Sequence, residues 1–165
     1  MEKRICIGNR WVGKNEPAFI IAEMSANHNM DFERAKEIIK GVKEAGADAV
    51  KLQTYTADTI TIDCDNDYFQ ITQGTLWDGT TLYKLYQKAY TPWEWQGELK
   101  KYAESMGLIC FSSPFDSTAV EFLENINVPA YKIASFEITD VPLIRKIARL
   151  GKPILISTGI AYLKD

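Results

Sequence analysis

Five segments of the chain begin with a continuous run of apolar residues, many of them β-branched or aromatic. They are residues 18–25, 49–55, 108–115, 130–135 and 153–159. Apolar residues that run on without alternation are typical of parallel strands that are covered on both faces. The last three segments begin at 108, 130 and 153, so one repeat takes about 23 residues. Such a short repeat favours a barrel over an open sheet.

Helical patterns with recognisable ends lie between these segments. The predicted N-terminal caps are Asp31, Thr91, Asp116 or Ser117, and Asp140, and three of the helices are expected to end at Gly46, Gly107 and Gly151. Thr91-Pro92-Trp93-Glu94 has the form of a capping box with a proline in the first turn. The order strand, helix, glycine, strand predicts a series of β/α units and therefore an α/β fold.

Two stretches depart from this repeat. Residues 4–13 carry Gly8-Asn9 between apolar residues, which predicts a β-hairpin ahead of the first parallel strand. Residues 56–90 form a long excursion after the second strand, rich in Asp, Thr, Tyr and Trp. Barrel enzymes place substrate-binding loops at this end of a strand, so the excursion is a candidate binding loop. A surface decoration without a binding role is the alternative.

Composition narrows the class of protein. The chain has 165 residues, 46% of them hydrophobic, and a net charge of −3, without a block of Lys or Arg, so we expect neither a nucleic-acid nor a membrane partner. No apolar run reaches the roughly 18 residues of a membrane helix, and no secretory core is present. Cys6, Cys64 and Cys110 are far apart, which predicts a reduced, cytoplasmic protein without disulfides or a cysteine zinc site. A complete (β/α)8 barrel takes about 250 residues, so the chain can hold only part of one.

Polar residues gather at the end of each predicted parallel strand. They are Glu23 and Ser25 followed by Asn27 and His28, then Lys51, Gln53 and Tyr55, then Ser112 and Ser113, then Lys132 and Ser135, and finally Ser157 and Thr158. In parallel α/β folds the carboxyl ends of the strands meet at one face, and binding sites form there. The pattern therefore predicts a polar cavity over an apolar barrel.

Lys51 and Lys132 each lie within an apolar strand, where an unpaired ammonium group is costly. Either lysine could pair with a buried carboxylate such as Glu23, but one such pair leaves the other lysine unexplained. Two lysines among serines and threonines favour an anionic ligand such as a phosphate or a carboxylate. Since Glu23 would repel an anion, we expect it to handle a proton or to orient a water or a metal. A salt-bridged core glutamate is the alternative.

Two further features are ambiguous. His28 is the single histidine, and at the mouth of the site it either shapes the loop or touches substrate. The aromatic residues between Trp77 and Trp95 favour core packing over a wall that stacks on a sugar. No metal site can be assembled from the residues of this chain.

Five motifs together identify a family. IIAEMSANHN, ADAVKLQTY, CFSSPF, AYKIASFE and ILISTGI, in this order and spacing, resemble the sialic acid synthase family of phosphoenolpyruvate-condensing enzymes. SANHN, KLQTYTADT, GTLWDGTTLYKLYQKAYTPWEW and YKIASFE are most similar to its pseudaminic acid synthase branch. The resemblance covers essentially the whole chain. It implies a (β/α)8 TIM barrel, followed by a small antifreeze-like domain, in a cytoplasmic homodimer.

The resemblance also implies a reaction. Phosphoenolpyruvate condenses with a 2,4-diacetamido-2,4,6-trideoxy hexose to give pseudaminic acid and phosphate, with a divalent metal, Mn or Mg, as cofactor. An N-acetylneuraminate or legionaminate synthase is the alternative within the family. The positions that match the phosphoenolpyruvate-binding residues are Lys51, Ser113, Lys132, Ser135 and Ser157. Glu23 matches the catalytic acid that positions or deprotonates the attacking water. The sugar-side positions are Gln53 and Glu137, with Asn27, His28 and Tyr55 as neighbours.

One departure from the family pattern concerns length. The metal-binding histidines of the family lie in later strands, whereas this sequence stops just after the fifth. We therefore expect residues 1–165 to be the N-terminal portion of a synthase barrel, without the last three β/α units, the antifreeze-like domain or metal ligands, and inactive alone. One rival is a Schiff-base aldolase with Lys132 as its nucleophile. The other is a non-catalytic partial barrel that binds a phosphorylated metabolite or assembles with a partner.

Overall fold

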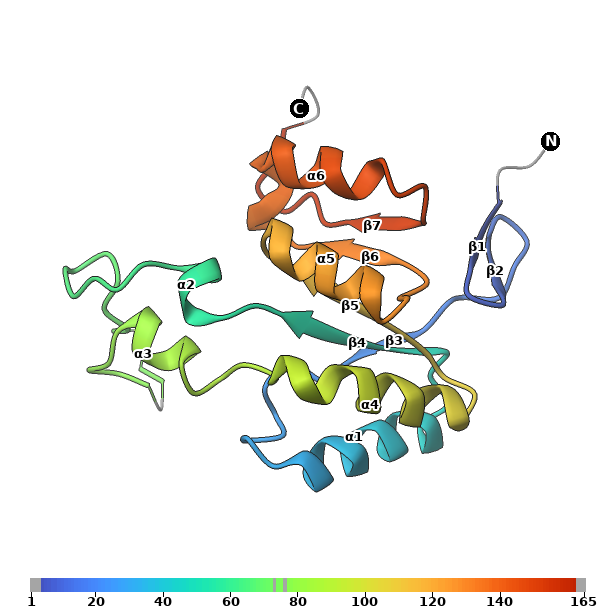
Figure 1. The fold of residues 1–165 in the computed structure, drawn as a ribbon, viewed down its shortest axis with the longest axis horizontal. Helices are drawn as coiled ribbons and strands as arrows, with labels where there is room; N and C mark the ends of the chain where they lie inside the picture. Colours follow the sequence, from blue (N-terminus) through green and yellow to red (C-terminus); the bar gives the residue numbers. More distant parts are fainter. Residues whose placement is uncertain (1–3, 73, 76, 163–165) are drawn as a thin grey trace.

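The computed structural model describes residues 4–72, 74–75 and 77–162, and in this part of the chain the strands form two sheets. β1 (Arg4–Ile7) and β2 (Arg10–Gly13) pair in an antiparallel hairpin. The second sheet is parallel and contains five strands in chain order (Figure 1). They are β3 (Ile21–Glu23), β4 (Ala49–Thr54), β5 (Ile109–Pro114), β6 (Tyr131–Ile133) and β7 (Ile154–Ile156). The predicted α/β fold and the hairpin are confirmed.

The register of the parallel sheet places the polar ends of neighbouring strands side by side. Glu23 pairs with Lys51, which pairs with Phe111 on the next strand. Lys132 lies further along the sheet, beside Leu155 of β7. All five strands run in the same direction, so their carboxyl ends meet at one edge, as in part of a β/α barrel.

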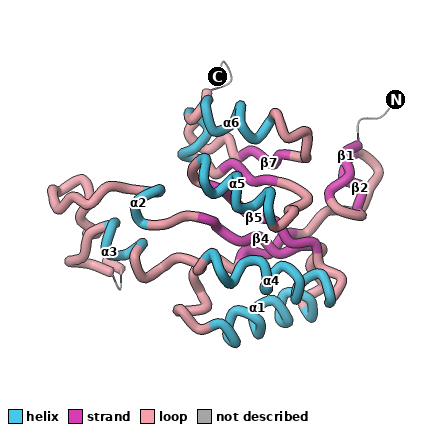
Figure 2. The backbone as a smooth tube through the Cα atoms, in the orientation of Figure 1, coloured by secondary structure: helices cyan, strands magenta, loops and turns pink. Residues whose placement is uncertain are grey.

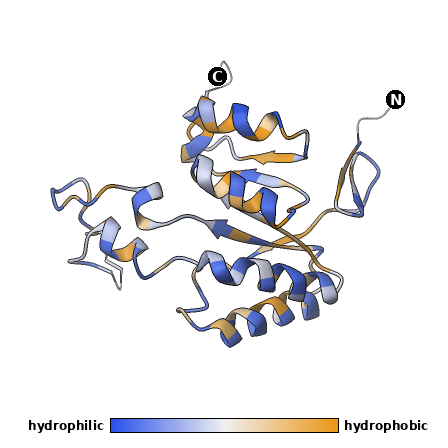
Figure 3. Ribbon diagram, in the orientation of Figure 1, coloured by the Kyte–Doolittle hydropathy of each residue, from blue (hydrophilic) through white to orange (hydrophobic). Residues whose placement is uncertain are grey.

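Four helices cover one face of the parallel sheet (Figure 1). They are α1 (Phe32–Glu44), α4 (Trp93–Ser105), α5 (Ser117–Asn125) and α6 (Val141–Ala148). Figure 3 shows that these helices carry both hydrophilic and hydrophobic residues, as expected of helices with one buried side. None of the helices within the described ranges is long and apolar enough to cross a membrane.

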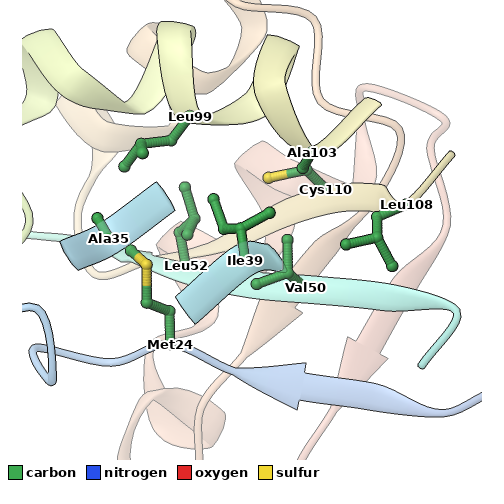
Figure 4. Close-up of a cluster of buried hydrophobic side chains, with 9 residues drawn as sticks. All are labelled: Met24, Ala35, Ile39, Val50, Leu52, Leu99, Ala103, Leu108 and Cys110. Carbon is green, nitrogen blue, oxygen red and sulfur yellow. The ribbon is translucent and has the colours of Figure 1, made fainter. Parts of the chain in front are cut away.

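Two apolar cores lie between the helices and the sheet. Figure 4 shows the first core, which is formed by Met24, Ala35, Ile39, Val50, Leu52, Leu99, Ala103, Leu108 and Cys110. The second packs α5 and α6 on β6 through Leu123, Ile133 and Ile147. Burial of each such side chain contributes about 1.5–3 kcal/mol, so these cores fix the helices on the sheet. Because side chains alternate along a strand, Lys51 faces away from the helices that cover Val50 and Leu52.

The hairpin packs on the opposite face of the sheet. Ile7 is buried there with Ala49, Phe111 and Ala130. The turn of the hairpin begins at Gly8, which has a φ of +60°. A Cβ at that position would approach within 3.2 Å of the Ile109 side chain. The glycine therefore allows both the turn and its close contact with β5.

Three of the predicted helix caps are confirmed. The Asp31, Asp116 and Asp140 side chains each accept a hydrogen bond from a backbone N–H in the first turn. The predicted capping box at Thr91 is wrong, because α4 begins after Pro92 and has no side-chain cap. The Thr91 hydroxyl is instead buried against the imidazole of His28. A long-range contact has replaced the local one.

The excursion between β4 and α4 projects beyond the carboxyl end of β4 (Figure 2). It contains two short helices, α2 (Ala57–Ile60) and α3 (Leu82–Tyr86), joined by loop. A bridge between Gln70 and Thr81 closes that loop. A single turn of 3-10 helix, η1 (Phe136–Thr139), follows β6. The excursion and η1 therefore stand at the same edge as the polar strand ends.

Candidate active site

Lys51 and Glu23 form an ion pair on the sheet face that the helices leave free. The Nζ of Lys51 lies 3.1 Å from Oε1 of Glu23. The Lys51 side chain is only 7% exposed, whereas that of Glu23 is 58% exposed. The ion pair that was the alternative interpretation is present, but its carboxylate is open to solvent rather than buried. Glu23 thus compensates the buried ammonium group and keeps access to a water molecule.

Lys132 has different surroundings. Its Nζ donates to the carbonyl oxygen of Ile133 at 2.7 Å and to the hydroxyl of Ser157. Within the described residues it forms no ion pair. Burial, and then the positive charge of Lys51, lower the pKa of Lys132 below its ordinary value. Tyr131 and Ile133 pack in the core against α5 and α6, so Lys132 between them faces away from the helices, as Lys51 does. An anion between them would relieve their repulsion.

The side chains of Ser112 and Ser113, two neighbouring residues of β5, point to opposite faces of the sheet. Ser112 faces the helices, where its hydroxyl lies 2.7 Å from that of Thr54. Ser113 is buried, and its Oγ has no hydrogen-bond partner within the described part of the chain. A buried hydroxyl without a partner is destabilising unless a ligand or a water satisfies it. Ser113 is one of the three serines predicted to bind phosphoenolpyruvate, and the structure leaves its hydroxyl available.

Three of the five predicted sugar-side residues line a cavity of about 690 Å³, together with Ser135, which was predicted to bind phosphoenolpyruvate. Gln53, Tyr55, Ser135 and Glu137 all contribute to its wall. The Oε2 atom of Glu137 is buried and has no hydrogen-bond partner among residues 4–72, 74–75 and 77–162, and burial raises the pKa of this carboxyl group. The hydroxyl of Tyr55 donates to the carbonyl oxygen of Ala89, and burial raises its pKa to about 12. Tyr55 therefore presents its ring, not a free hydroxyl.

Asn27 and His28 lie at different positions relative to the cavities. Asn27 lines a second cavity, of about 710 Å³, that adjoins the first. His28 is fully buried and lines neither cavity. Its Nδ1 accepts the backbone N–H of Met30, and its Nε2 lies 3.1 Å from the Thr91 hydroxyl. Of the two interpretations of His28, this geometry matches the one in which it shapes the loop.

Sequence reasoning missed part of the cavity wall. Trp77 lines both cavities, and Lys88 lines the second. Trp77 is 42% exposed, whereas the aromatic pattern favoured core packing. The signal that could have separated Trp77 from Trp93 and Trp95 is its position within the excursion, away from a regular helical repeat.

The described residues include no group of three or more His, Cys, Asp or Glu side chains that could hold a metal ion. Glu23 pairs with Lys51, and Glu137 lies near both Lys132 and Asp140, which does not amount to such a group. The side chains of the described ranges therefore do not make a metal centre by themselves.

The comparisons with known proteins agree with this geometry. Residues 38–165 match the model of the NeuB family, which is more than half of the chain. The chain belongs to the NeuB family. It is 57% identical over 146 residues to the pseudaminic acid synthase of Helicobacter pylori, an alignment that covers 88% of this chain and 43% of that protein. It is 35% identical over 153 residues to the N,N'-diacetyllegionaminic acid synthase of Legionella pneumophila, with 93% and 43% covered.

Solved structures give the same assignment. The N-acetylneuraminic acid synthetase of Leptospira borgpetersenii serovar Hardjo-bovis, solved in complex with citrate, superposes with a TM-score of 0.84 at 28% identity. That match covers 99% of this chain and 52% of that one. The family resemblance and the partial TIM barrel predicted from sequence are confirmed. The NeuB-family chain spans less than half the length of the Helicobacter and Legionella synthases that it matches.

Proposed function

We propose that this chain carries the phosphoenolpyruvate-binding part of a nonulosonate synthase that makes pseudaminic acid. The reaction joins phosphoenolpyruvate to a 2,4-diacetamido-2,4,6-trideoxy hexose and releases phosphate. One observation carries the proposal. Lys51 and Lys132 come from separate strands and, by strand alternation, share one face of the sheet with Ser113, whose hydroxyl has no partner among the described residues. The high identity to a pseudaminic acid synthase supports the choice of product.

The residues at the strand ends suit the shape of phosphoenolpyruvate. This substrate carries a phosphate and a carboxylate on a three-carbon frame, so it needs cations and hydroxyl donors on more than one side. Lys51 and Lys132 supply the cations. Ser113, Ser135 and Ser157 supply hydroxyls from three successive strand ends. Because these strands are held by the apolar cores, the donors are fixed before the ligand arrives.

Glu23 is proposed to act on water. When C3 of phosphoenolpyruvate attacks the aldehyde carbon of the open sugar, positive charge develops at C2, and a water molecule adds there before phosphate leaves. The solvent-exposed carboxylate of Glu23 can orient that water and accept its proton. Its ion pair with Lys51 keeps the carboxylate at the level of the proposed anion site.

The aldehyde oxygen that becomes negative needs a separate stabilising group. In the longer protein a divalent Mn or Mg ion would supply this, but the described residues do not form its ligand set. For that reason we expect no synthase turnover from this polypeptide by itself. A homodimer and a cytoplasmic location are further proposals for the full-length enzyme.

Binding of phosphoenolpyruvate to this polypeptide tests the proposal. Calorimetry should detect binding, and Lys132→Met should weaken it by roughly 10-fold or more, the effect of losing one charge-assisted hydrogen bond. Lys40→Met is the matched control, because Lys40 lies on the exposed side of α1 and pairs with Glu44 of the same helix. Equal affinities for the two variants would refute the anion site.

The lowered pKa of Lys132 favours a second candidate, a Schiff-base aldolase. A lysine beside another cation deprotonates more easily and is a better nucleophile. Borohydride reduction in the presence of pyruvate, followed by mass spectrometry, separates the two candidates. An adduct on Lys132 would establish the aldolase, whereas a synthase gives none.

The outer strands of the sheet favour a third candidate, a non-catalytic module that assembles with a partner. In the described part of the chain β3 and β7 each have a single paired neighbour, and Ile20 and Ile156 are exposed beside them. Size-exclusion chromatography with light scattering tests assembly. A sugar panel on a full-length version, comparing N-acetylmannosamine with the diacetamido sugar, separates pseudaminate synthesis from neuraminate and legionaminate synthesis.

A further inference from the structure

The loop between β3 and α1 has an unusual backbone. Ser25, Asn29 and Met30 have positive φ angles of 51°, 50° and 58°. Residues other than glycine rarely adopt this left-handed region, and each such residue costs of the order of 1 kcal/mol or more. Three of them within six residues require the surrounding structure to hold the loop. Strain of this kind is concentrated at ligand sites.

His28 holds this loop in place. Its buried imidazole accepts the N–H of Met30 and contacts the Thr91 hydroxyl. The imidazole ring also packs edge-on against Trp95 of α4, with ring centroids 5.7 Å apart. One side chain thus ties the strained loop to α4. The loop is therefore a fixed wall and not a freely moving segment.

This fixed loop forms one wall of the second cavity. The opposite wall comes from the excursion and contains Trp77, Lys88 and Ala89. Ser25, Ala26, Trp77 and Ala89 line both the second cavity and the first, in which the sugar-side residues lie. The two cavities are therefore neighbouring compartments that share the Trp77 side chain.

The chemistry of the second cavity is mixed. Asn27 donates its Nδ2 to the carbonyl oxygen of Met24 at 3.0 Å, which leaves its Oδ1 to accept a hydrogen bond. Lys88 is an exposed donor. Trp77 and Met30 offer apolar surface, and they are 42% and 41% exposed. An N-acyl group is complementary to these three features, because it has an N–H donor, a carbonyl acceptor and an apolar methyl group. Phosphate sites usually combine several charge-assisted donors, whereas the described lining of this cavity includes one cationic side chain, Lys88.

We propose that the second cavity is a subsite for an N-acyl arm of the sugar, and that Trp77 is the residue that determines specificity for this arm. The inference rests on the proposed function, because the first cavity must hold the sugar ring. In this arrangement the acyl methyl group packs on Trp77 and Met30. Its carbonyl oxygen accepts from Lys88, and its N–H donates to Asn27.

Sugar binding to the 165-residue polypeptide tests the subsite. The probes are the 2,4-diacetamido-2,4,6-trideoxy hexose, an analogue with the 4-acetamido group replaced by hydroxyl, and N-acetylmannosamine 6-phosphate. Affinities are measured by saturation-transfer NMR and calorimetry. We expect the diacetamido sugar to bind about 10-fold more tightly than the hydroxyl analogue, and Trp77→Ala to abolish that difference.

Matched variants give the controls. Trp11→Ala removes a tryptophan of similar exposure from the hairpin, and Lys84→Met removes a lysine of α3 that lines neither cavity. Both should keep the 10-fold preference, whereas Lys88→Met should reduce it. A preference that survives Trp77→Ala overturns the subsite. So does tighter binding of the phosphorylated sugar that depends on Lys88, which would indicate an anion site.

The same titrations separate the two proposals. If phosphoenolpyruvate binds but the sugars do not discriminate, the subsite is wrong and the anion site stands. If phosphoenolpyruvate does not bind, the proposed function fails, and the subsite fails with it.

Discussion

The Nε2 atom of His28 lies 3.1 Å from the Oγ1 atom of Thr91, across 63 residues of sequence, and both side chains are buried. Since Nδ1 of the same ring accepts the N–H of Met30, the imidazole is neutral, with its proton on Nε2 and donated to Thr91. Protonation at Nδ1 would set a second N–H against that of Met30. The loop that lines both cavities therefore depends on a neutral histidine.

The first prediction concerns the pH dependence of stability. Burial lowers the pKa of His28 below its ordinary value of 6.5. Just below pH 6.5 the folded chain therefore binds fewer protons than the unfolded chain. The stability that the neutral His28 contributes is fully present above pH 6.5 and is lost as the pH falls toward the lowered pKa. Urea unfolding at pH 7.5 and 5.5 should show that His28→Gln costs more stability at the higher pH.

The His28 titration has a direct readout. His28 is the single histidine of the chain, so its imidazole proton resonances can be assigned without ambiguity. They should titrate below pH 6.5 in the folded protein. An equal stability loss for His28→Gln at both pH values, or an ordinary titration, would contradict the role of the neutral ring.

The His28 contact also shows where sequence patterns stop being informative. Apolar runs and helix caps located all five parallel strands and the helices that cover them, because these features depend on neighbours within a few residues. The polar residues at the strand ends likewise indicated that Lys51 belongs to the site. Thr91 was assigned to a local cap, since a capping box is a short-range pattern, and its distant partner leaves no trace in the spacing.

The cavity wall shows the same limit. The local pattern does not tell whether Trp77 packs in a core or lines a cavity, because that depends on how the excursion folds back over the strand ends. Nor does it show the left-handed backbone at Ser25 and Asn29, which is held by tertiary contacts. The exposure of Glu23 beside a buried Lys51 likewise required the sheet register.

A second prediction compares two adjacent serines. Ser113→Ala removes a buried hydroxyl that has no partner, so we expect the free energy of unfolding to be unchanged or slightly higher while phosphoenolpyruvate affinity falls several-fold. Ser112→Ala removes the hydrogen bond to Thr54 and should cost about 1 kcal/mol with no effect on the ligand. Chemical denaturation and calorimetry on both variants check this. A reversal of the two phenotypes would show that Ser113 is only structural.

The third prediction follows from the lowered pKa of Lys132. The ordinary pKa of a lysine is 10.5, and burial, together with the positive charge of Lys51, lowers the pKa of Lys132 below that value. Since only the protonated amine binds an anion as a cation, phosphoenolpyruvate affinity should fall as the pH rises from 8 toward 10. In Lys132→Arg the positive charge persists over this pH range, so the affinity should decline less. In Lys132→Met the binding should be weak throughout, and it should depend less on pH. Calorimetry across this range provides the measurement, and identical profiles for all three proteins would exclude Lys132 from the anion site.

The last prediction concerns the close approach of Gly159 to Ser135. A Cβ added to Gly159 would lie 3.0 Å from Oγ and 3.3 Å from Cβ of Ser135, closer than an ordinary contact. Gly159→Ala should therefore displace the Ser135 hydroxyl and weaken phosphoenolpyruvate binding several-fold. Gly41→Ala is the matched control, because it makes the same chemical change within α1, where no described atom other than the adjacent helix backbone lies within 4 Å of the new methyl group. The control should gain about 0.5–1 kcal/mol of stability from helix propensity and bind normally. If Gly159→Ala binds as tightly as Gly41→Ala, Ser135 does not contact the anion.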